Sequence, residues 1–197
     1  MKTISLILLS LLGSSILYAQ PHLHEWNSGY YEMYSSATFK RLDIVNQKID
    51  PNHIDYPLLN AAIFYRTNEE RAHNGRKEFL HSPDLERAAY GHCKDMVKYK
   101  FYSHTSPVSG KSSMSDRLHA AGVDYAHAGE NIYDFFEKSP TYWELADGLV
   151  KGWMKSEGHK KNILNSNFKF LGCGAHHYIN TEWRDYFWVK STQNFSS

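Results

Sequence analysis

The first clear helical pattern lies in the segment beginning at Pro57. Apolar side chains recur there at steps of three and four residues, which places them on one face of an α-helix: Leu58, Ala61, Ala62 and Tyr65. The polar run "NEERAHNG" then leads to Gly75, a residue typical of helix ends. The pattern predicts a helix with one buried face that stops at Gly75.

A second amphipathic segment, "HSPDLERAAYGHCKDMVKYK", has its own start signal. Ser82 can accept N-cap hydrogen bonds, and Pro83 suits the first helical position. Its apolar face carries Leu85, Ala88, Ala89, His92, Cys93 and Met96. We interpret His92 on that face as a packed histidine rather than a ligand. A shorter helix, "SSMSDRLHAAG", is predicted to end at Gly122.

The last predicted helix follows "SPTYWE". Ser139 can cap it, Pro140 fits its first turn, and Thr141 with Glu144 has the spacing of a capping box. Its buried stripe is Ala146, Leu149, Val150, Trp153 and Met154. The helix runs into "SEGHKKNIL", where Gly158 is expected to be the glycine that ends it.

The C-terminal part changes period from helix to strand. "FKFLGCGAHHYI" and "RDYFWVKSTQNF" are rich in aromatic and β-branched residues, with "NTEW" between them. Such a pair predicts an antiparallel hairpin in a buried sheet. Helices followed by strands indicate an α+β layer fold with helices packed on an antiparallel sheet.

The N-terminal residues suggest export. Residues 1–20, "MKTISLILLSLLGSSILYAQ", have one lysine and a short interrupted apolar run, which is typical of a secretory signal peptide. No other segment approaches the roughly 20 apolar residues of a membrane span. Residues 21–54 are taken as an N-terminal extension, with a weak helical pattern at Phe39, Leu42, Val45 and Ile49 that Pro51 ends. We therefore expect a secreted or periplasmic protein.

Charge and cysteine content narrow the candidate partners. Removing Lys2 with the signal peptide leaves 21 basic against 21 acidic residues, since the full chain has 22 and 21. A neutral chain gives no electrostatic reason to expect nucleic acid as a partner. The two cysteines, Cys93 and Cys173, allow either one disulfide or two buried free thiols.

Ionisable residues gather in three loop-like places. His104 lies in "FYSHTSP", Glu130 in "AGENIY", where neither a helical nor a strand pattern is evident, and Glu157 with His159 in "SEGHKK". Two imidazoles and a carboxylate could coordinate zinc with an open position for water. They could equally form a metal-free acid–base pair. Each also has a structural interpretation: His104 closing a turn, Glu130 accepting loop N–H groups, and His159 lying near a helix end.

The order of five segments resembles one family. "NEERAHNG", "DLERAAYGHCKDM", "FYSHTSP", "RLHAAGVDYAHAGENI" and "WMKSEGHKKNIL", followed by "LGCGAHHY" and "TQNF", are similar to the CAP superfamily, or SCP-domain family, of secreted proteins. The form W-x-x-S-x-G-H-x-x-N-I-L is that of the bacterial branch. The resemblance implies a CAP domain over residues 55–197 and a three-layer α-β-α sandwich with a central antiparallel sheet.

The resemblance also implies a cleft in which particular residues meet. Carried over by motif, His104 and Glu130 converge there, and His159 matches the second histidine of a tetrad. The tetrad's second glutamate falls on Ser156, so Glu157, one place later, is only a loose match and assists from the side or faces solvent. His104, Glu130 and His159 are the expected metal ligands, with zinc as the candidate ion and the same residues as catalytic candidates.

Three functions follow as hypotheses. The leading one is a binding module whose cleft holds a divalent metal, a small molecule or a lipid. The second is a secreted interaction protein that recognises a protein partner through its loops and residues 21–54. The third is a cleft-based hydrolase or protease, although the chain lacks H-E-x-x-H and G-x-S-x-G.

Overall fold

The computed structural model describes residues 26–197, so the predicted signal peptide lies outside the described residues. Helices and strands alternate along the chain in the order η1 (Ser28–Glu32), α1 (Ser36–Phe39), η2 (Asp43–Asn46), α2 (Tyr56–His73), β1 (Leu80–His81), α3 (Pro83–Lys98), α4 (Met114–Ala120), β2 (Ala128–Glu137), α5 (Tyr142–Lys155), α6 (Glu157–Ile163), β3 (Phe170–Tyr178) and β4 (Phe187–Ser196), where η marks a 3-10 helix.

The sheet has four strands in the order β1-β3-β4-β2. The predicted C-terminal hairpin is confirmed, because β3 and β4 pair antiparallel from Phe170 opposite Ser196 to Tyr178 opposite Trp188. Strand β2 pairs antiparallel with β4 and forms one edge, while the two residues of β1 pair parallel to β3 at the other. The strand β2 that carries Glu130 is therefore an edge strand.

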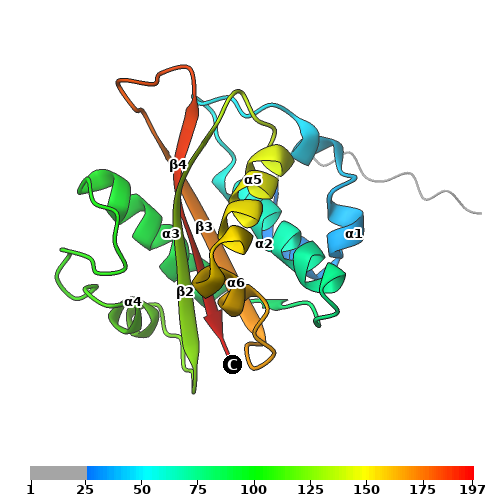
Figure 1. Ribbon diagram of the computed structural model, residues 1–197, viewed down its shortest axis with the longest axis vertical. Helices are drawn as coiled ribbons and strands as arrows, with labels where there is room; N and C mark the ends of the chain where they lie inside the picture. The colour runs from blue at the N-terminus through cyan, green and yellow to red at the C-terminus, as the bar shows by residue number, and fades with distance from the viewer. Residues whose placement is uncertain (1–25) are drawn as a thin grey trace, which may run out of the picture.

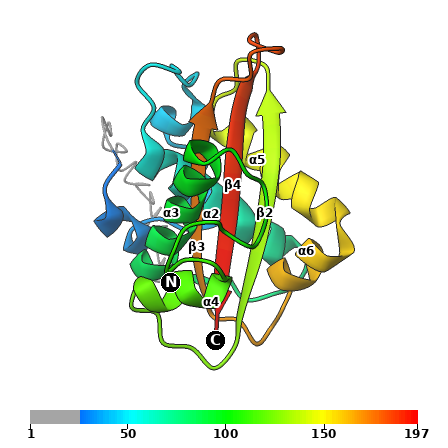
Figure 2. The same cartoon turned by 90° about the vertical axis from the view of Figure 1, so that its left-hand side faces the viewer.

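Helices cover both faces of this sheet, which confirms the three-layer α-β-α sandwich. Helices α2 and α5 pack against each other and on one face, and α3 packs on the other (Figure 1). The view turned by a right angle shows α3 and α4 in front of the strands, with α2 and α5 behind them (Figure 2). No helix within residues 26–197 combines the length and apolarity needed to cross a bilayer.

The predicted helices form with most of their expected end signals. The Ser82 side chain accepts from the Leu85 N–H to cap α3, and Thr141 with Glu144 forms the capping box of α5. Ser139, the expected N-cap, does not cap α5, because Thr141 takes that position. It lies two residues before Thr141 with a φ of 47° and so belongs to the turn after β2.

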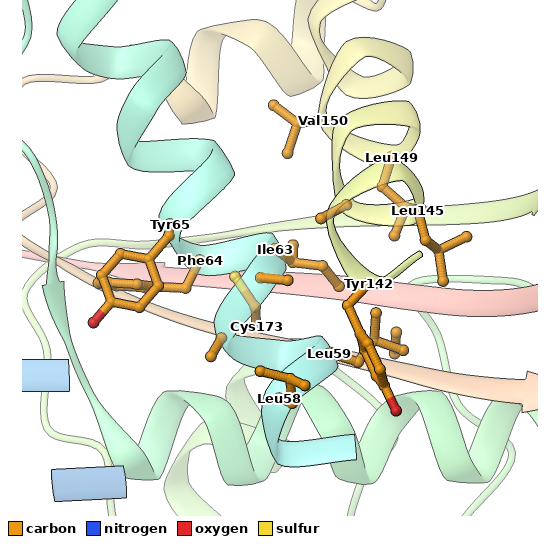
Figure 3. Close-up of a cluster of buried hydrophobic side chains, with 14 of the residues drawn as sticks. Leu58, Leu59, Ile63, Phe64, Tyr65, Tyr142, Leu145, Leu149, Val150 and Cys173 are labelled. Atoms are coloured by element: carbon orange, nitrogen blue, oxygen red, sulfur yellow. The ribbon is translucent and has the colours of Figure 1, made fainter. Parts of the chain in front are cut away.

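The core between α2, α5 and the sheet is aliphatic and aromatic. Leu59 and Ile63 of α2 face Leu145 and Leu149 of α5, and Cys173 of β3 lies among them (Figure 3). Residues 26–54 contribute to this same core, since Trp26, Phe39, Leu42, Ile44, Val45 and Ile49 are buried in it. The weak helical pattern expected there is realised as short α1 and η2 in place of one helix.

On the opposite face, α3 approaches the sheet more closely than side chains would allow. A Cβ added to Gly172 would lie 2.0 Å from the Glu86 backbone nitrogen, and one added to Gly174 would lie 2.4 Å from that of Tyr90. The glycines of "GCG" therefore permit contact between helix backbone and strand.

Both cysteines are buried free thiols in this structure. Cys93 of α3 contacts the sheet from one side, with its sulfur 3.2 Å from Thr192 Oγ1. Cys173 lies between Gly172 and Gly174, which face α3, so its own side chain points to the α2 side. The two thiols thus lie on opposite faces of the sheet.

Candidate functional site

His104 and Glu130 meet at the free edge of β2. His104 lies in the connection between α3 and α4, which reaches across the sheet to β2 (Figure 2). Glu130 is on β2 itself, opposite Asn194 of β4, and not in the loop that its sequence context suggested. The strand was missed because an edge strand with polar residues on both faces shows little hydrophobic alternation.

A short hydrogen bond joins the two residues. His104 Nδ1 is 2.8 Å from Glu130 Oε1, and the carboxylate is 3% exposed while the imidazole is 55% exposed. Because a carboxylate only accepts, Nδ1 carries the proton and donates it. The tautomer leaves Nε2 of the exposed ring as an acceptor, free to meet a ligand, a metal ion or a proton.

Arg117 of α4 completes the network from behind. Its Nη2 lies 2.9 and 2.8 Å from the two oxygens of Glu130 and 3.1 Å from the His104 carbonyl oxygen. Its Nη1 donates to the carbonyls of Lys111 and Ser112. The guanidinium, 1% exposed, therefore fixes both the carboxylate and the loop that carries His104.

Arg117 was not among the residues predicted for the site. It stands in "SDRLHAAG" next to Leu118, one turn before Ala121, in a helix whose surface charges look alike. Its burial is visible only in the folded protein, where an arginine on such a face needs a charged partner.

These partners decide the charge of Glu130. Burial alone would raise the pKa of the carboxyl group, but the hydrogen bond from His104 and the positive charge of Arg117 outweigh it. The pKa of Glu130 is lowered below its ordinary value, so the group is a carboxylate at neutral pH. With its amide turned to donate, Asn194 also reaches Oε2 at 3.2 Å.

His159 approaches the site from α6, on the other side of the β2 edge. The expectation that Gly158 ends the preceding helix is wrong. Helix α5 ends at Lys155, and α6 starts at Glu157. Ser156 between them has an extended backbone with a ψ of 122°. Burial lowers the pKa of His159, and repulsion between the protonated forms of His159 and His104 lowers it further. Glu157, the other candidate in this segment, is exposed to solvent.

Amide side chains hold α6 against β2. Asn131 Nδ2 donates to the His159 carbonyl at 3.1 Å and to Gln193 Oε1 at 3.0 Å. Asn162 Nδ2 donates to Asn131 Oδ1 at 2.9 Å. Gln193 continues inward to Thr67 of α2 at 2.7 Å. The backbone of the residue that bears the second imidazole is thus tied through the sheet to the core.

The donor set bears on the metal hypothesis. Both oxygens of Glu130 already accept from Arg117, and one accepts from His104, so the carboxylate faces protein donors. Within residues 26–197, no three His, Cys, Asp or Glu side chains are arranged to hold a metal ion. The groups of this site that retain a lone pair for a cation are the imidazoles of His104 and His159.

This fold defines an SCP-type domain, and comparison with known proteins identifies the family. The model of the CAP family, described as the cysteine-rich secretory protein family, matches residues 64–190. That match spans more than half of the chain. The protein belongs to the CAP family.

Curated relatives are longer proteins. "Uncharacterized protein YkwD" of Bacillus subtilis is 39% identical over 108 residues, which are 55% of this chain and 38% of that protein. "Uncharacterized membrane protein YlbC" of the same organism is 36% identical over 109 residues, 55% of this chain and 29% of that one. The chain thus matches well under half the length of each.

Solved structures confirm the fold. An extracellular protein containing an SCP domain from Bacillus anthracis superposes with a TM-score of 0.57 and 29% identity, covering 76% of this chain and 44% of that one. An outer surface protein from Borrelia burgdorferi gives a TM-score of 0.55 at 15% identity, covering 77% and 98% respectively. At that identity the second likeness concerns the fold alone.

Proposed function

We propose that this protein is an exported binding module that engages its ligand beside β2 through His104 and His159. The observation that carries the proposal is the pairing of an exposed imidazole with a buried, charged support. Glu130 and Arg117 hold His104 Nδ1 in place while the rest of the ring faces solvent. Burying an ion pair contributes little net stability to a fold, so its place behind an exposed histidine favours a role in binding.

Glu130 acts in this proposal as a support and not as a direct ligand. A carboxylate that accepts the Nδ1 proton of a histidine fixes the ring and makes Nε2 a better donor to a cation. A divalent ion would then engage the imidazoles of His104 and His159 and complete its coordination with water or with a bound molecule. A neutral ligand would find the same Nε2 as a hydrogen-bond acceptor.

Zinc titration tests the metal form of the proposal. We expect saturable zinc binding to the purified protein that weakens by at least about tenfold in His104→Ala and in His159→Ala, because each change removes one of two imidazole ligands. His73→Ala, at the exposed end of α2, is the matched control and should bind like the parent. Equal zinc affinity in all four proteins would reject a metal site at the cleft.

Export rests on the predicted leader over residues 1–20 and on the extracellular relative. The expected product is a chain that begins at Gln20 or Pro21 in the medium or periplasm. N-terminal sequencing of the fractionated protein checks this, and a cell-associated product that begins at Met1 would contradict it.

A second candidate, recognition of a protein partner, is favoured by one surface. Aromatic rings cluster at the open end of the sheet, where Phe136 lies 4.4 Å from Trp188 and 5.2 Å from Tyr186 between ring centroids. Phe136 and Trp183 are about half exposed. Exposed aromatic side chains of this kind are enriched in interfaces. A cleft variant such as His104→Ala should leave partner binding at this surface unchanged.

A further inference from the structure

A pocket lies between the N-terminal segment of residues 26–54 and the start of α3, separate from the site proposed above. Its volume is about 750 Å³, within the range of about 300–1,000 Å³ that is usual for small-molecule sites. Residues 28–35 line it on one side and residues 77–83 on another, while α2 and Phe170 of β3 complete the lining. Neither His104 nor His159 contributes to this lining.

A second imidazole held by a carboxylate borders this pocket. His81 Nε2 lies 2.6 Å from Glu86 Oε2, and the Tyr31 hydroxyl donates to the same oxygen at 2.9 Å. Asn60 Nδ2 reaches the other oxygen at 3.4 Å. Because a carboxylate only accepts, His81 Nε2 carries the proton that joins the two groups. The rings of Tyr31 and His81 also stack, with centroids 3.5 Å apart and an interplanar angle of 6°, so the imidazole is fixed in position.

The other ring nitrogen of His81 remains accessible. Nδ1 is unpaired within residues 26–197 and, unlike Nδ1 of His92, it is not sealed from solvent. The side chain is 10% exposed, and the residue lines the pocket. In the neutral ring Nδ1 is an acceptor, because Nε2 holds the proton. A guest in the pocket can therefore donate a hydrogen bond to His81.

The charged part of the lining is acidic on balance. Glu32 and Glu78 contribute carboxylates, and Lys77 is the single lysine or arginine among the lining residues. Glu78 accepts from Ser36 Oγ at 2.5 Å through one oxygen. Glu32 is exposed and has no cationic partner in the part of the chain that the structure describes. The pocket therefore favours a guest with a positive charge.

Aromatic side chains supply the apolar part of the pocket. Tyr31, Tyr34 and Phe170 in its lining are each partly exposed, and Leu80 is 59% exposed. Aromatic rings cover the apolar body of a ligand, and their faces attract cations. Such a lining suits a molecule that combines an apolar body with a cationic end.

We propose that this pocket binds an organic ammonium ion, the cation of a primary amine on an aromatic or aliphatic body. The ammonium group donates to His81 Nδ1 and is attracted by Glu32 and Glu78, and the apolar body packs on the partly exposed rings. Because the lining joins residues 28–35 to β1, a bound ligand bridges the N-terminal segment to the rest of the domain.

Calorimetric titration of the purified protein with phenethylammonium at pH 8 tests the site. At this pH an alkylamine is protonated and free histidine is neutral. We expect saturable binding, with a shift of the ¹⁵N resonance of His81 Nδ1 as it gains a donor. The unfolding temperature should rise with ligand concentration, because a ligand that binds only the folded state stabilises it.

Two charge variants in the lining should change the affinity in opposite directions. Glu32→Gln removes an attractive charge and should weaken phenethylammonium binding by about threefold or more. Lys77→Gln removes a repulsive charge and should strengthen binding. Both side chains are exposed, so neither change disturbs the core. Glu182→Gln makes the same charge change as Glu32→Gln in the turn at the far end of β3 and should bind like the parent.

A third variant tests the imidazole itself. His81→Phe keeps a ring that can stack on Tyr31 but has no acceptor, so it should weaken binding about tenfold. Far-ultraviolet circular dichroism and the unfolding midpoint show whether this variant folds. If it does not, the two exposed charge variants keep the test valid.

Matched probes separate the charge of the ligand from its hydrogen-bond donor. Trimethylated phenethylammonium keeps the charge without an N–H group and should bind more weakly, and equal binding would overturn the contact with His81. Phenylethanol has no charge and phenylpropionate has the opposite one, so both should bind far more weakly. No saturable binding of phenethylammonium, equal binding of phenylethanol, or the same affinity in Glu32→Gln, Lys77→Gln and the parent would overturn the proposal.

Discussion

At the scale of single residues, the guanidinium of Arg117 joins groups from three parts of the chain. It binds both oxygens of Glu130 on β2, the carbonyl of His104, and the carbonyls of Lys111 and Ser112 before α4. Removing one partner of a buried ion pair leaves the other charge uncompensated, which is far more costly than the net contribution of the pair.

We therefore predict that Arg117→Ala lowers the free energy of unfolding by about 3–5 kcal/mol. Adding Glu130→Gln to it should recover part of that loss, because the double variant no longer buries an unpaired carboxylate. Urea denaturation measures both, and exposed Arg184→Ala serves as the control. A loss below about 1 kcal/mol in Arg117→Ala would show that the pair is dispensable.

His92 gives a prediction about pH. Its pKa is about 4 in the folded protein, chiefly through burial, against about 6.5 when unfolded. Between these values the unfolded state binds more protons, so stability is fully present above pH 6.5 and falls as the pH drops toward 4. The share due to His92 is about 3 kcal/mol.

His92→Gln can still donate to the Ser103 carbonyl but does not titrate. The variant should lose less stability than the parent between pH 7 and pH 4.5, as measured by urea midpoints at the two values. The pKa values of His159, His176 and His177 are lowered as well, so acid sensitivity persists in part. An unchanged pH dependence in His92→Gln would contradict the assignment.

The sequence located the histidines and the glutamate of the site but not the residue that supports them. His104 and Glu130 sit in short segments whose order resembles a family, and that order implied their meeting. Arg117 has no such mark, because a buried arginine and a surface arginine look alike in a short amphipathic helix. Burial depends on residues far away in the chain, here on β2 and the loop at 104–112.

At the scale of elements, the contact between α3 and β3 depends on two glycines. A Cβ at Gly172 or Gly174 would press on helix backbone at 2.0 and 2.4 Å, and backbone cannot turn aside as a side chain can. Overpacking of this kind costs about 1–3 kcal/mol and sometimes more.

Accordingly, Gly174→Ala should destabilise the protein by about 3 kcal/mol or more. Gly152→Ala is the informative comparison, since its Cβ would meet Tyr133 Cε1 at 2.3 Å, which belongs to a side chain that can rotate. The loss should be smaller there. Chemical denaturation of the two variants decides, and equal losses would argue against backbone contact as the cause.

The helices were the best-predicted elements because their periods and caps are local. The edge strand β2 and the separate helix α6 were not predicted, since neither is determined by local preference. Ser156 breaks the helix without any side-chain cap of its own, and the short α6 is then secured by Asn131 and Asn162. Those hydrogen bonds join residues about thirty positions apart, which no window along the sequence contains.

At the scale of the whole molecule, residues 26–54 supply core side chains to the sandwich. Trp26 packs edge-on against Phe39, Tyr30 and Tyr31, with ring centroids 5.1 to 5.4 Å apart. This aromatic cluster rests on α2 through Tyr65, whose ring stacks on Phe39 at 4.1 Å. The segment therefore takes part in the packing of the domain.

Trp26→Ala should thus destabilise the protein by about 3–5 kcal/mol, the range for deleting a buried tryptophan. The matched change is Trp183→Ala, which removes a half-exposed tryptophan and should alter stability by less than about 1 kcal/mol. Thermal and urea unfolding compare the two. Equal stability of both variants would mean that the N-terminal segment is only loosely docked.

Because the two thiols lie on opposite faces of the sheet, their reactivities report separately on the opening of the two helical layers. Cys93 becomes reachable when α3 lifts from the sheet, and Cys173 when the α2 layer lifts. In single-cysteine variants, the rate of reaction with a thiol reagent would measure how fast each helical layer opens. Equal rates would mean that the sandwich opens as one unit. Unequal rates would show which helical layer separates from the sheet first.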